Sequence, residues 1–232
     1  MKFNKNLLRN VHRWLGLIAG VQLLLWTISG LYFSLIPIDE IHGDHLLTKE
    51  AIPLPVSRFQ LVSPSDLILK YPEIKDATLE NFRLSAVLGK PVYVVMQHRF
   101  DARTAEMLEP ISRSEAIAIV AARTDIEILS AALISEVEPG NEFRGGDLPA
   151  WKVNIAEENA SIYVSANSGR IRAVRNFSWR IFDFLWALHI MDYEDRDDFN
   201  NLLLKFMSGL AVITVASGLI LFFVTQRWGS MR

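Results

Sequence analysis

The stretch WLGLIAGVQLLLWTISGLYFSLIP, from Trp14 to Pro37, contains no charged side chain. A helix of about 20 apolar residues crosses the roughly 30 Å hydrocarbon core of a bilayer, so this stretch is long enough to span one. A second stretch, LLLKFMSGLAVITVASGLILFFVT, ends at Thr225 and carries only Lys205, near enough to its start to reach the interface. The two stretches predict transmembrane helices at residues 14–37 and 201–225. The first is longer than the apolar core of about 7–15 residues in a signal peptide, so we interpret it as an uncleaved anchor.

Charge is segregated along the chain. Residues 37–200 hold all 26 Asp and Glu but only 17 of the 24 Lys and Arg, a formal charge of −9. The flanks carry only basic residues: Lys2, Lys5, Arg9 and Arg13 before the first span, and Arg227 and Arg232 after the second. The positive-inside rule therefore predicts a bacterial inner-membrane protein whose termini, residues 1–13 and 226–232, are cytoplasmic. The acidic middle is then periplasmic or otherwise extracytoplasmic, and its charge argues against a nucleic-acid partner.

The segment between the spans contains the same pattern twice, as repeat 1 with a linker (38–110) and repeat 2 (111–175). Each begins with a short helix, at 63–69 and again from Ser112 or Ser114, and continues into antiparallel strands. Residues 91–95 align with 149–153 at an offset of 58, and residues 100–107 align with 164–171 at an offset of 64. The pattern predicts two similar α+β units that share one core. The alternative is two unrelated hairpins with similar turn residues.

The turns of the two repeats carry a family resemblance. Val164, Ser165, Ser168 and Gly169 stand where PepSY domains have V-D-x-x-T-G, and Phe100, Asp101 and Thr104 stand at the same places, with Ala105 in place of the glycine. The flanks NVHRWLGL (10–17) and Leu188-His189, with Asn200 and a Ser-Gly-Leu span after them, resemble PepSY-associated transmembrane proteins. The resemblance implies an α+β membrane protein, with two transmembrane helices flanking a tandem PepSY-like extracytoplasmic domain. Larger relatives have four spans and include haem-containing ferric-siderophore reductases, so haem b is the candidate cofactor.

Histidines are the candidate cofactor ligands, because imidazole binds haem and metals. His42, His45 and His189 all fall near the outer ends of the predicted spans, so they are expected to approach one another around a haem b or a small metal site. His12 falls at the cytoplasmic end of the first span, where it is either a haem ligand or an interfacial anchor. About 30 Å of hydrocarbon would separate His12 from His189, too far for both to bind one haem in a monomer.

Residues 176–200 and the first span supply candidate interaction residues. Asn176–Ile190 is too short to span and is expected at the outer interface, where Trp179 and Trp186 would cover a haem, dock a partner helix or form an aromatic belt. The acidic run that follows would attract a cation or a basic partner, or be a solvated face: Asp192, Asp195, Asp197 and Asp198. Gly16 and Gly20 form a G-x-x-x-G face that permits close helix packing, within the chain, with a membrane-protein partner or in a homodimer.

Two hypotheses about function follow. The first is an accessory or binding subunit, or a regulator, of a membrane redox or iron-handling complex. The second is a haem-binding electron-transfer protein, which as an enzyme would be a haem-dependent ferric reductase. The chain has no cysteine, which excludes disulfides, thiolate nucleophiles and Cys-ligated iron–sulfur sites, and it has no hydrolase or phosphate-loop motif.

Overall fold

The structure is a computed structural model that describes residues 5–137, 141–144 and 146–225. The predicted cytoplasmic segment 226–232 lies outside the described residues. The chain divides into two compact units, a helical unit formed by residues 1–37 and 181–232 and an α+β unit formed by residues 38–180.

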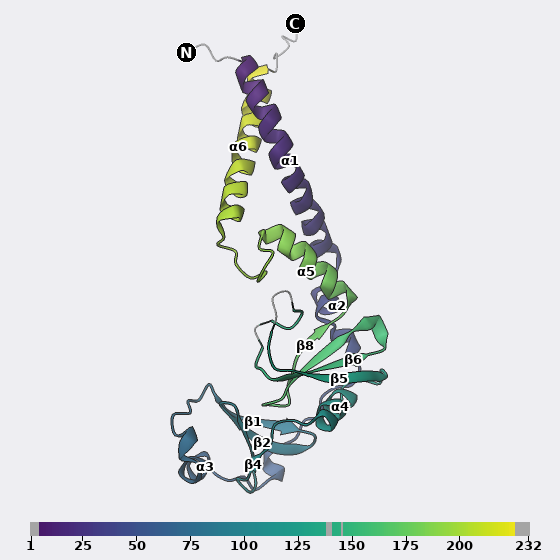
Figure 1. Ribbon diagram of the computed structural model, residues 1–232, viewed down its shortest axis with the longest axis vertical. Coiled ribbons are helices and arrows are strands. Elements are labelled where there is room, and N and C mark those ends of the chain that lie inside the picture. The colour runs from purple at the N-terminus through teal and green to yellow at the C-terminus, as the bar shows by residue number, and fades with distance from the viewer. Residues whose placement is uncertain (1–4, 138–140, 145, 226–232) are drawn as a thin grey trace. The chain divides into compact units, whose positions relative to one another are not determined.

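The helical unit is built on two long helices, α1 (Lys5–Leu35) and α6 (Leu202–Thr225), which run side by side (Figure 1). At 1.5 Å per residue they are about 46 Å and 36 Å long, enough to cross a bilayer. By length and composition Arg9–Leu35 and Leu202–Thr225 are the candidate spans, as predicted. Helix α1 ends before Pro37, because the proline ring disfavours helical backbone at the residue that precedes it. A third helix, α5 (Phe177–Ile190), leads towards α6, and its residues from Ile181 onward belong to the helical unit.

The α+β unit contains two four-stranded antiparallel sheets, each with its strands in chain order and each preceded by a helix. The first set is α3 (Pro64–Lys70), β1 (Phe82–Val87), β2 (Lys90–Val95), β3 (His98–Asp101) and β4 (Met107–Leu108). The second set is α4 (Arg113–Ala121), β5 (Ile128–Ile134), β6 (Ala150–Ile155), β7 (Ser161–Ser165) and β8 (Ile171–Arg175). Short helical segments connect them: α2 (Ile38–His42), η1 (Asp44–Leu46), η2 (Val56–Arg58), η3 (Pro72–Ile74) and η4 (Glu157–Asn159). The predicted order, helix then antiparallel strands, occurs twice.

Equivalent backbone hydrogen bonds are made at the same positions of the two repeats. The backbone N–H of Ala102 donates to the carbonyl of Pro91 at 3.1 Å, and the N–H of Ala166 donates to that of Pro149 at 2.9 Å. These are the pairs expected from the sequence offsets of 58 and 64. Ala105 takes a left-handed conformation with φ 54°, which matches φ 70° at its counterpart Gly169. The turn therefore keeps one shape in both repeats, although only the second has the glycine that adopts it without strain.

The starts of α3 and α4 are equivalent as well. Ser63 Oγ accepts a hydrogen bond from the N–H of Asp66, and Ser112 Oγ accepts one from the N–H of Glu115. The Glu115 carboxylate also accepts a hydrogen bond from the N–H of Ser112 at 2.8 Å, completing a capping box at α4. Ser112, rather than Ser114, is thus the N-cap. These side chains satisfy N–H groups that have no partner within the helix.

The two repeats share one hydrophobic core. Side chains alternate along β2, so that Val92 and Val94 face this core while Tyr93 and Val95 face α3. The shared core also contains Val120 of α4 and Val153 of β6. A smaller cluster on the other face of the second sheet stacks Phe143 on Tyr163, with ring centroids 4.8 Å apart. Burial from both repeats in one cluster confirms the predicted common core.

Candidate functional site around His189 and His12

Helix α5 is held in place at both ends by named side chains. At its start the amide oxygen of Asn176 accepts a hydrogen bond from the N–H of Trp179 at 2.8 Å. At its end Met191 turns the chain with φ 56°, so the last carbonyl groups of the helix lack intrahelical partners. Those carbonyls accept side-chain hydrogen bonds instead: Leu188 from Gln22, His189 from Trp26 at 2.7 Å, and Ile190 from Asn201 at 2.8 Å. Two of the three donors lie on α1, which fixes His189 against that helix.

The imidazole of His189 is oriented by Ser29 of α1. Ser29 Oγ lies 2.7 Å from Nδ1 of His189 and also 2.9 Å from the carbonyl oxygen of Leu25. A hydroxyl has one hydrogen, and donation to the backbone carbonyl leaves the oxygen to accept from the ring. In that arrangement Nδ1 of His189 carries the proton. The lone pair of Nε2 is then available to bind a metal centre or to accept a proton.

His12 is oriented in the same way at the other end of the helix pair. Its Nδ1 lies 2.8 Å from Oγ of Ser217 on α6, and that hydroxyl lies 2.8 Å from the carbonyl oxygen of Thr214. The ring rests against Gly218, where a Cβ would lie 2.9 Å from Cε1 of His12. Gly218 therefore provides the space that lets the imidazole sit between α1 and α6. With the Ser217 hydroxyl donating to the Thr214 carbonyl, the proton of His12 would lie on Nδ1 and the lone pair on Nε2.

Aromatic rings surround His189 on one side. Phe33 lies with its ring centroid 5.6 Å from that of His189 and 4.8 Å from that of Phe182. Phe182 stacks on Trp186 at 5.8 Å, and the indole N–H of Trp186 donates to the carbonyl of Arg196 at 3.1 Å. Beside this cluster Arg196 forms an ion pair with Asp183, whose side chain is buried. The rings shield one side of the imidazole, which strengthens electrostatic interactions there.

The comparison with known families identifies the group to which this arrangement belongs. The family model described as the PepSY-associated TM region matches residues 9–232. The chain belongs to this family. The match includes both candidate spans, the two repeats, and the His12 and His189 positions, and it agrees with the resemblance seen in the turns and flanks. No curated protein and no solved structure matches the chain.

The other predicted ligands of this PepSY-associated membrane protein lie in the α+β unit. His42 is exposed at the end of α2, and His45 Nε2 lies 2.9 Å from a carboxylate oxygen of Glu158. His189 belongs to the helical unit. Within that unit His12 and Ser29, the partner of His189, are separated by about 26 Å of helix rise along α1. In the part of the chain that the structure describes, no three His, Cys, Asp or Glu side chains are grouped as a metal site requires.

The predicted interaction residues fall in three different settings. Trp179 is only 8% exposed, and the guanidinium of Arg175 lies over its ring at 4.1 Å. The ring therefore packs inside the α+β unit. Asp192 organises the acidic loop, since its carboxylate accepts hydrogen bonds from the N–H groups of Asp197 and Asp198 at 2.9 and 3.0 Å. These N–H groups lower the pKa of Asp192 against the opposing effect of burial. The side chains of Asp195, Asp197 and Asp198 are exposed.

Gly16 and Gly20 of α1 have open space at their Cβ positions. No atom lies within 4 Å of the Cβ position of either glycine, in contrast to Gly218. Within the described residues the G-x-x-x-G face is therefore free for another helix.

Sequence reasoning missed the residues that position His189. Gln22 and Ser29 are polar, lie inside an apolar span and are 7% and 0% exposed, which is the signal that marks a buried hydrogen-bonding role. In the sequence, Trp26 is indistinguishable from the other apolar residues of the span. Only the structure shows that its indole N–H donates to a carbonyl at the end of α5. The Asp183–Arg196 ion pair joins α5 to the acidic loop, and no helical or strand spacing in the sequence indicates it.

Proposed function

We propose that this protein is an accessory subunit that binds a partner in a membrane redox or iron-handling complex. The observation that carries the proposal is the open space at Gly16 and Gly20 of α1, a G-x-x-x-G pair whose Cβ positions have no neighbour within 4 Å among the described residues. In lipid, helices associate through close backbone approach, which small residues permit. The occupant of this face is a helix of a partner membrane protein or of a second copy of the chain.

The proposed orientation places the α+β unit in the periplasm of a bacterial inner membrane and both termini in the cytoplasm. The distribution of charge supports it, because only basic residues flank the spans while residues 37–200 carry a formal charge of −9. Labelling of cysteines introduced singly at Glu73 and Asn6 with a membrane-impermeant reagent tests it in intact spheroplasts. Labelling at residue 73 alone is expected, and labelling at residue 6 alone would overturn the orientation.

The docking proposal is tested by filling the free face. Gly16→Leu and Gly20→Leu introduce side chains where a partner helix would approach, and Gly209→Leu makes the same change at an open position on α6. The mass of the detergent-extracted complex is measured for each variant. Loss of the associated mass in the α1 variants, with the α6 variant unchanged, supports the proposal. A mass equal to the single chain in the parent protein would overturn it.

A second candidate function is haem-dependent electron transfer, and the orientation of His12 and His189 favours it. In each, a serine hydroxyl lies at hydrogen-bond distance from Nδ1, and a hydrogen bond at that nitrogen would orient the ring and leave Nε2 to bind a metal centre. The donor chemistry of these residues therefore fits a haem. When bound, haem supplies one-electron transfer. The two histidines lie at different levels of the helix pair, so each would bind a separate group.

An absorption spectrum of the detergent-extracted protein separates the two functions. A Soret band that is weakened in His12→Ala and in His189→Ala, but unchanged in the exposed His98→Ala, supports electron transfer. His42→Ala and His45→Ala test the proposed site near the outer interface in the same way. A colourless protein that keeps its partner rules out the haem candidate and leaves the accessory role.

A further inference from the structure

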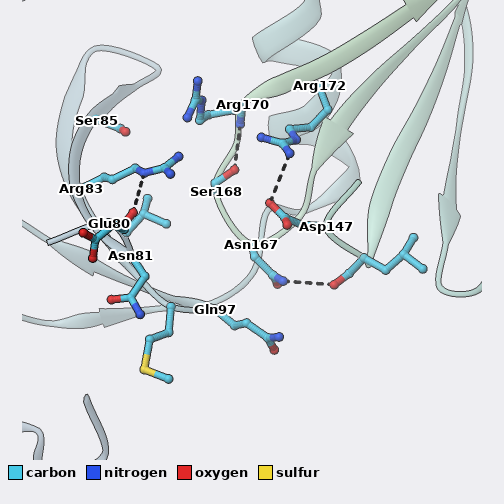
Figure 2. Close-up of a pocket in the computed structure, with 13 residues that line it drawn as sticks. Glu80, Asn81, Arg83, Ser85, Gln97, Asp147, Asn167, Ser168, Arg170 and Arg172 are labelled. Atoms are coloured by element: carbon cyan, nitrogen blue, oxygen red, sulfur yellow. Dashed lines mark hydrogen bonds and ion pairs between the residues drawn. The ribbon is translucent and has the colours of Figure 1, made fainter. Parts of the chain in front are cut away.

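A polar pocket lies between the two repeats, where an edge strand of each sheet is exposed. Strand β1 ends the first sheet and strand β8 ends the second. The pocket has a volume of about 260 Å³. Repeat 1 lines it with β1 and its flanks, β2 and the β2–β3 turn, and repeat 2 with β8, the β7–β8 turn and the segment before β6. Figure 2 shows Arg83 reaching into the hollow from repeat 1, and Arg170 and Arg172 from repeat 2.

Among the described residues, the three guanidinium groups have few hydrogen-bond partners. Arg83 uses Nε to donate to the carbonyl of Glu80 at 3.1 Å, which orients the side chain and leaves both terminal nitrogens. Arg172 forms a long ion pair with Asp147 at 3.9 Å, which is beyond hydrogen-bond distance and leaves its N–H donors available. Within the described residues no side-chain hydrogen bond or ion pair holds Arg170; its backbone N–H donates to Ser168.

Charge makes this pocket unlike the rest of the unit. Its lining has three arginines against two carboxylates, Glu80 and Asp147, whereas residues 37–200 as a whole carry −9. The Glu80 carboxylate is engaged by the side chain of Thr78, which lowers its pKa. Like charges on facing strands repel, so an arrangement of three guanidinium groups around a hollow is stabilised by an anion between them.

We propose that this pocket binds a small oxyanion that carries two or more carboxylate or phosphate groups. Guanidinium groups match both kinds of group through paired N–H donors. A volume of about 260 Å³ is below the range of about 300–1,000 Å³ typical of drug-sized ligands, so the ligand is small. Because Arg83 comes from repeat 1 and Arg170 and Arg172 come from repeat 2, a bound anion would also link the two repeats. The proposal is independent of the partner and of haem.

Binding is measured by calorimetry on the full-length protein in detergent, at constant ionic strength set with chloride. Tricarballylate, which has three carboxylates, and pyrophosphate are the probes. Saturable binding of one probe identifies carboxylate or phosphate as the preferred group, and binding of both shows that the site selects charge alone. Absence of saturable binding by either probe would overturn the proposal.

Substitutions locate the site. Arg83→Gln and Arg170→Gln, one in each repeat, are each expected to weaken binding about tenfold or more, since a hydrogen bond to a charged group contributes about 1.5–3 kcal/mol. Arg58→Gln removes the same charge from η2, outside the pocket, and is expected to leave affinity unchanged. Equal loss in all three variants would show nonspecific attraction and refute the site. The thermal midpoint of each variant confirms that it is folded, and either pocket variant alone is sufficient for the test.

Discussion

Tyr93 and Trp151 make the same hydrogen bond in the two repeats. Tyr93 Oη donates to the carbonyl of Val62 at 2.8 Å, and Trp151 Nε1 donates to the carbonyl of Ile111 at 2.7 Å. Each acceptor immediately precedes the N-cap serine of the helix in its repeat. Two different aromatic residues thus tie a strand to the start of a helix at equivalent places, which explains why an aromatic residue with a polar end is present at both.

Removal of this hydrogen bond is expected to destabilise the α+β unit. Tyr93→Phe keeps the ring, which is 5% exposed, but leaves the Val62 carbonyl without its donor. A hydrogen bond of this kind contributes about 0.5–1.5 kcal/mol to the free energy of unfolding. Chemical denaturation of the parent and the variant measures the loss. Tyr193→Phe is the control, because that side chain is 54% exposed, and a similar loss in the control would contradict the assignment.

Exchanging alanine and glycine at the equivalent turn positions 105 and 169 is expected to change stability in opposite directions. Gly169→Ala adds a Cβ at φ 70°, 3.1 Å from side-chain carbons of both Ile111 and Val87, and left-handed backbone costs an L-residue about 1–2 kcal/mol. We expect a loss of stability of about that size. Ala105→Gly relieves the same conformation at φ 54° and is expected to leave the protein at least as stable as the parent. Thermal unfolding compares the two variants, and a larger loss in Ala105→Gly would show that the turns are not equivalent.

Stability on the acid side is expected to depend on Glu142. Burial opposes ionisation of this carboxyl, but the Arg180 guanidinium, hydrogen-bonded at 2.5 Å, lowers its pKa overall. The folded-state pKa is thus below the unfolded value, so the ion pair stabilises the protein at neutral pH. This contribution begins to be lost when the pH falls below the unfolded-state pKa of about 4. It is gone once the pH is below the lowered folded-state pKa.

Glu142→Gln should therefore reduce the difference in thermal midpoint between pH 7 and the acid range. The exposed Glu136→Gln serves as the control. An unchanged pH profile in Glu142→Gln would show that the ion pair does not contribute.

Arg99 of β3 is a buried charge whose removal is expected to increase stability. Its side chain is 5% exposed, and Nε and Nη1 have no hydrogen-bond partner among the residues that the structure describes. Burial lowers the pKa of Arg99, and the Glu115 carboxylate offsets this only in part. Because an unsatisfied buried polar group costs about 1–3 kcal/mol, Arg99→Met should raise the free energy of unfolding by a similar amount. A fall in stability, with Arg58→Met unchanged, would show that the guanidinium has a stabilising partner.

The cap from Trp26 is expected to protect the end of α5. Trp26→Phe keeps an aromatic ring on α1 but removes the indole N–H that donates to the carbonyl of His189. Hydrogen exchange measured by mass spectrometry should accelerate in peptides that cover the last turn of α5. Trp14→Phe, at a ring that is 60% exposed, should leave these peptides unchanged. Equal protection in both variants would mean that the cap does not hold the helix.

Local patterns in the sequence were sufficient for the two candidate spans, the repeat and the α+β fold class. Apolar runs without charge, such as Trp14–Pro37, identify a span because lipid tolerates no unpaired polar group. The serine caps Ser63 and Ser112 mark the helix starts because those hydrogen bonds are made within a few residues. Even the match between Ala105 and Gly169 was visible from offsets alone.

What joins distant segments was decided only in three dimensions. The sequence places Ser29 and His189 far apart, and no periodicity states that α5 returns to α1 or that Gln22 and Trp26 complete its end. The same holds for Ser217 beside His12 and for the arginines of both repeats around one pocket. These contacts depend on which helix faces pack and which strand edges meet. The tertiary arrangement sets both, because burial and hydrogen-bond satisfaction are properties of the whole packed chain rather than of any one segment.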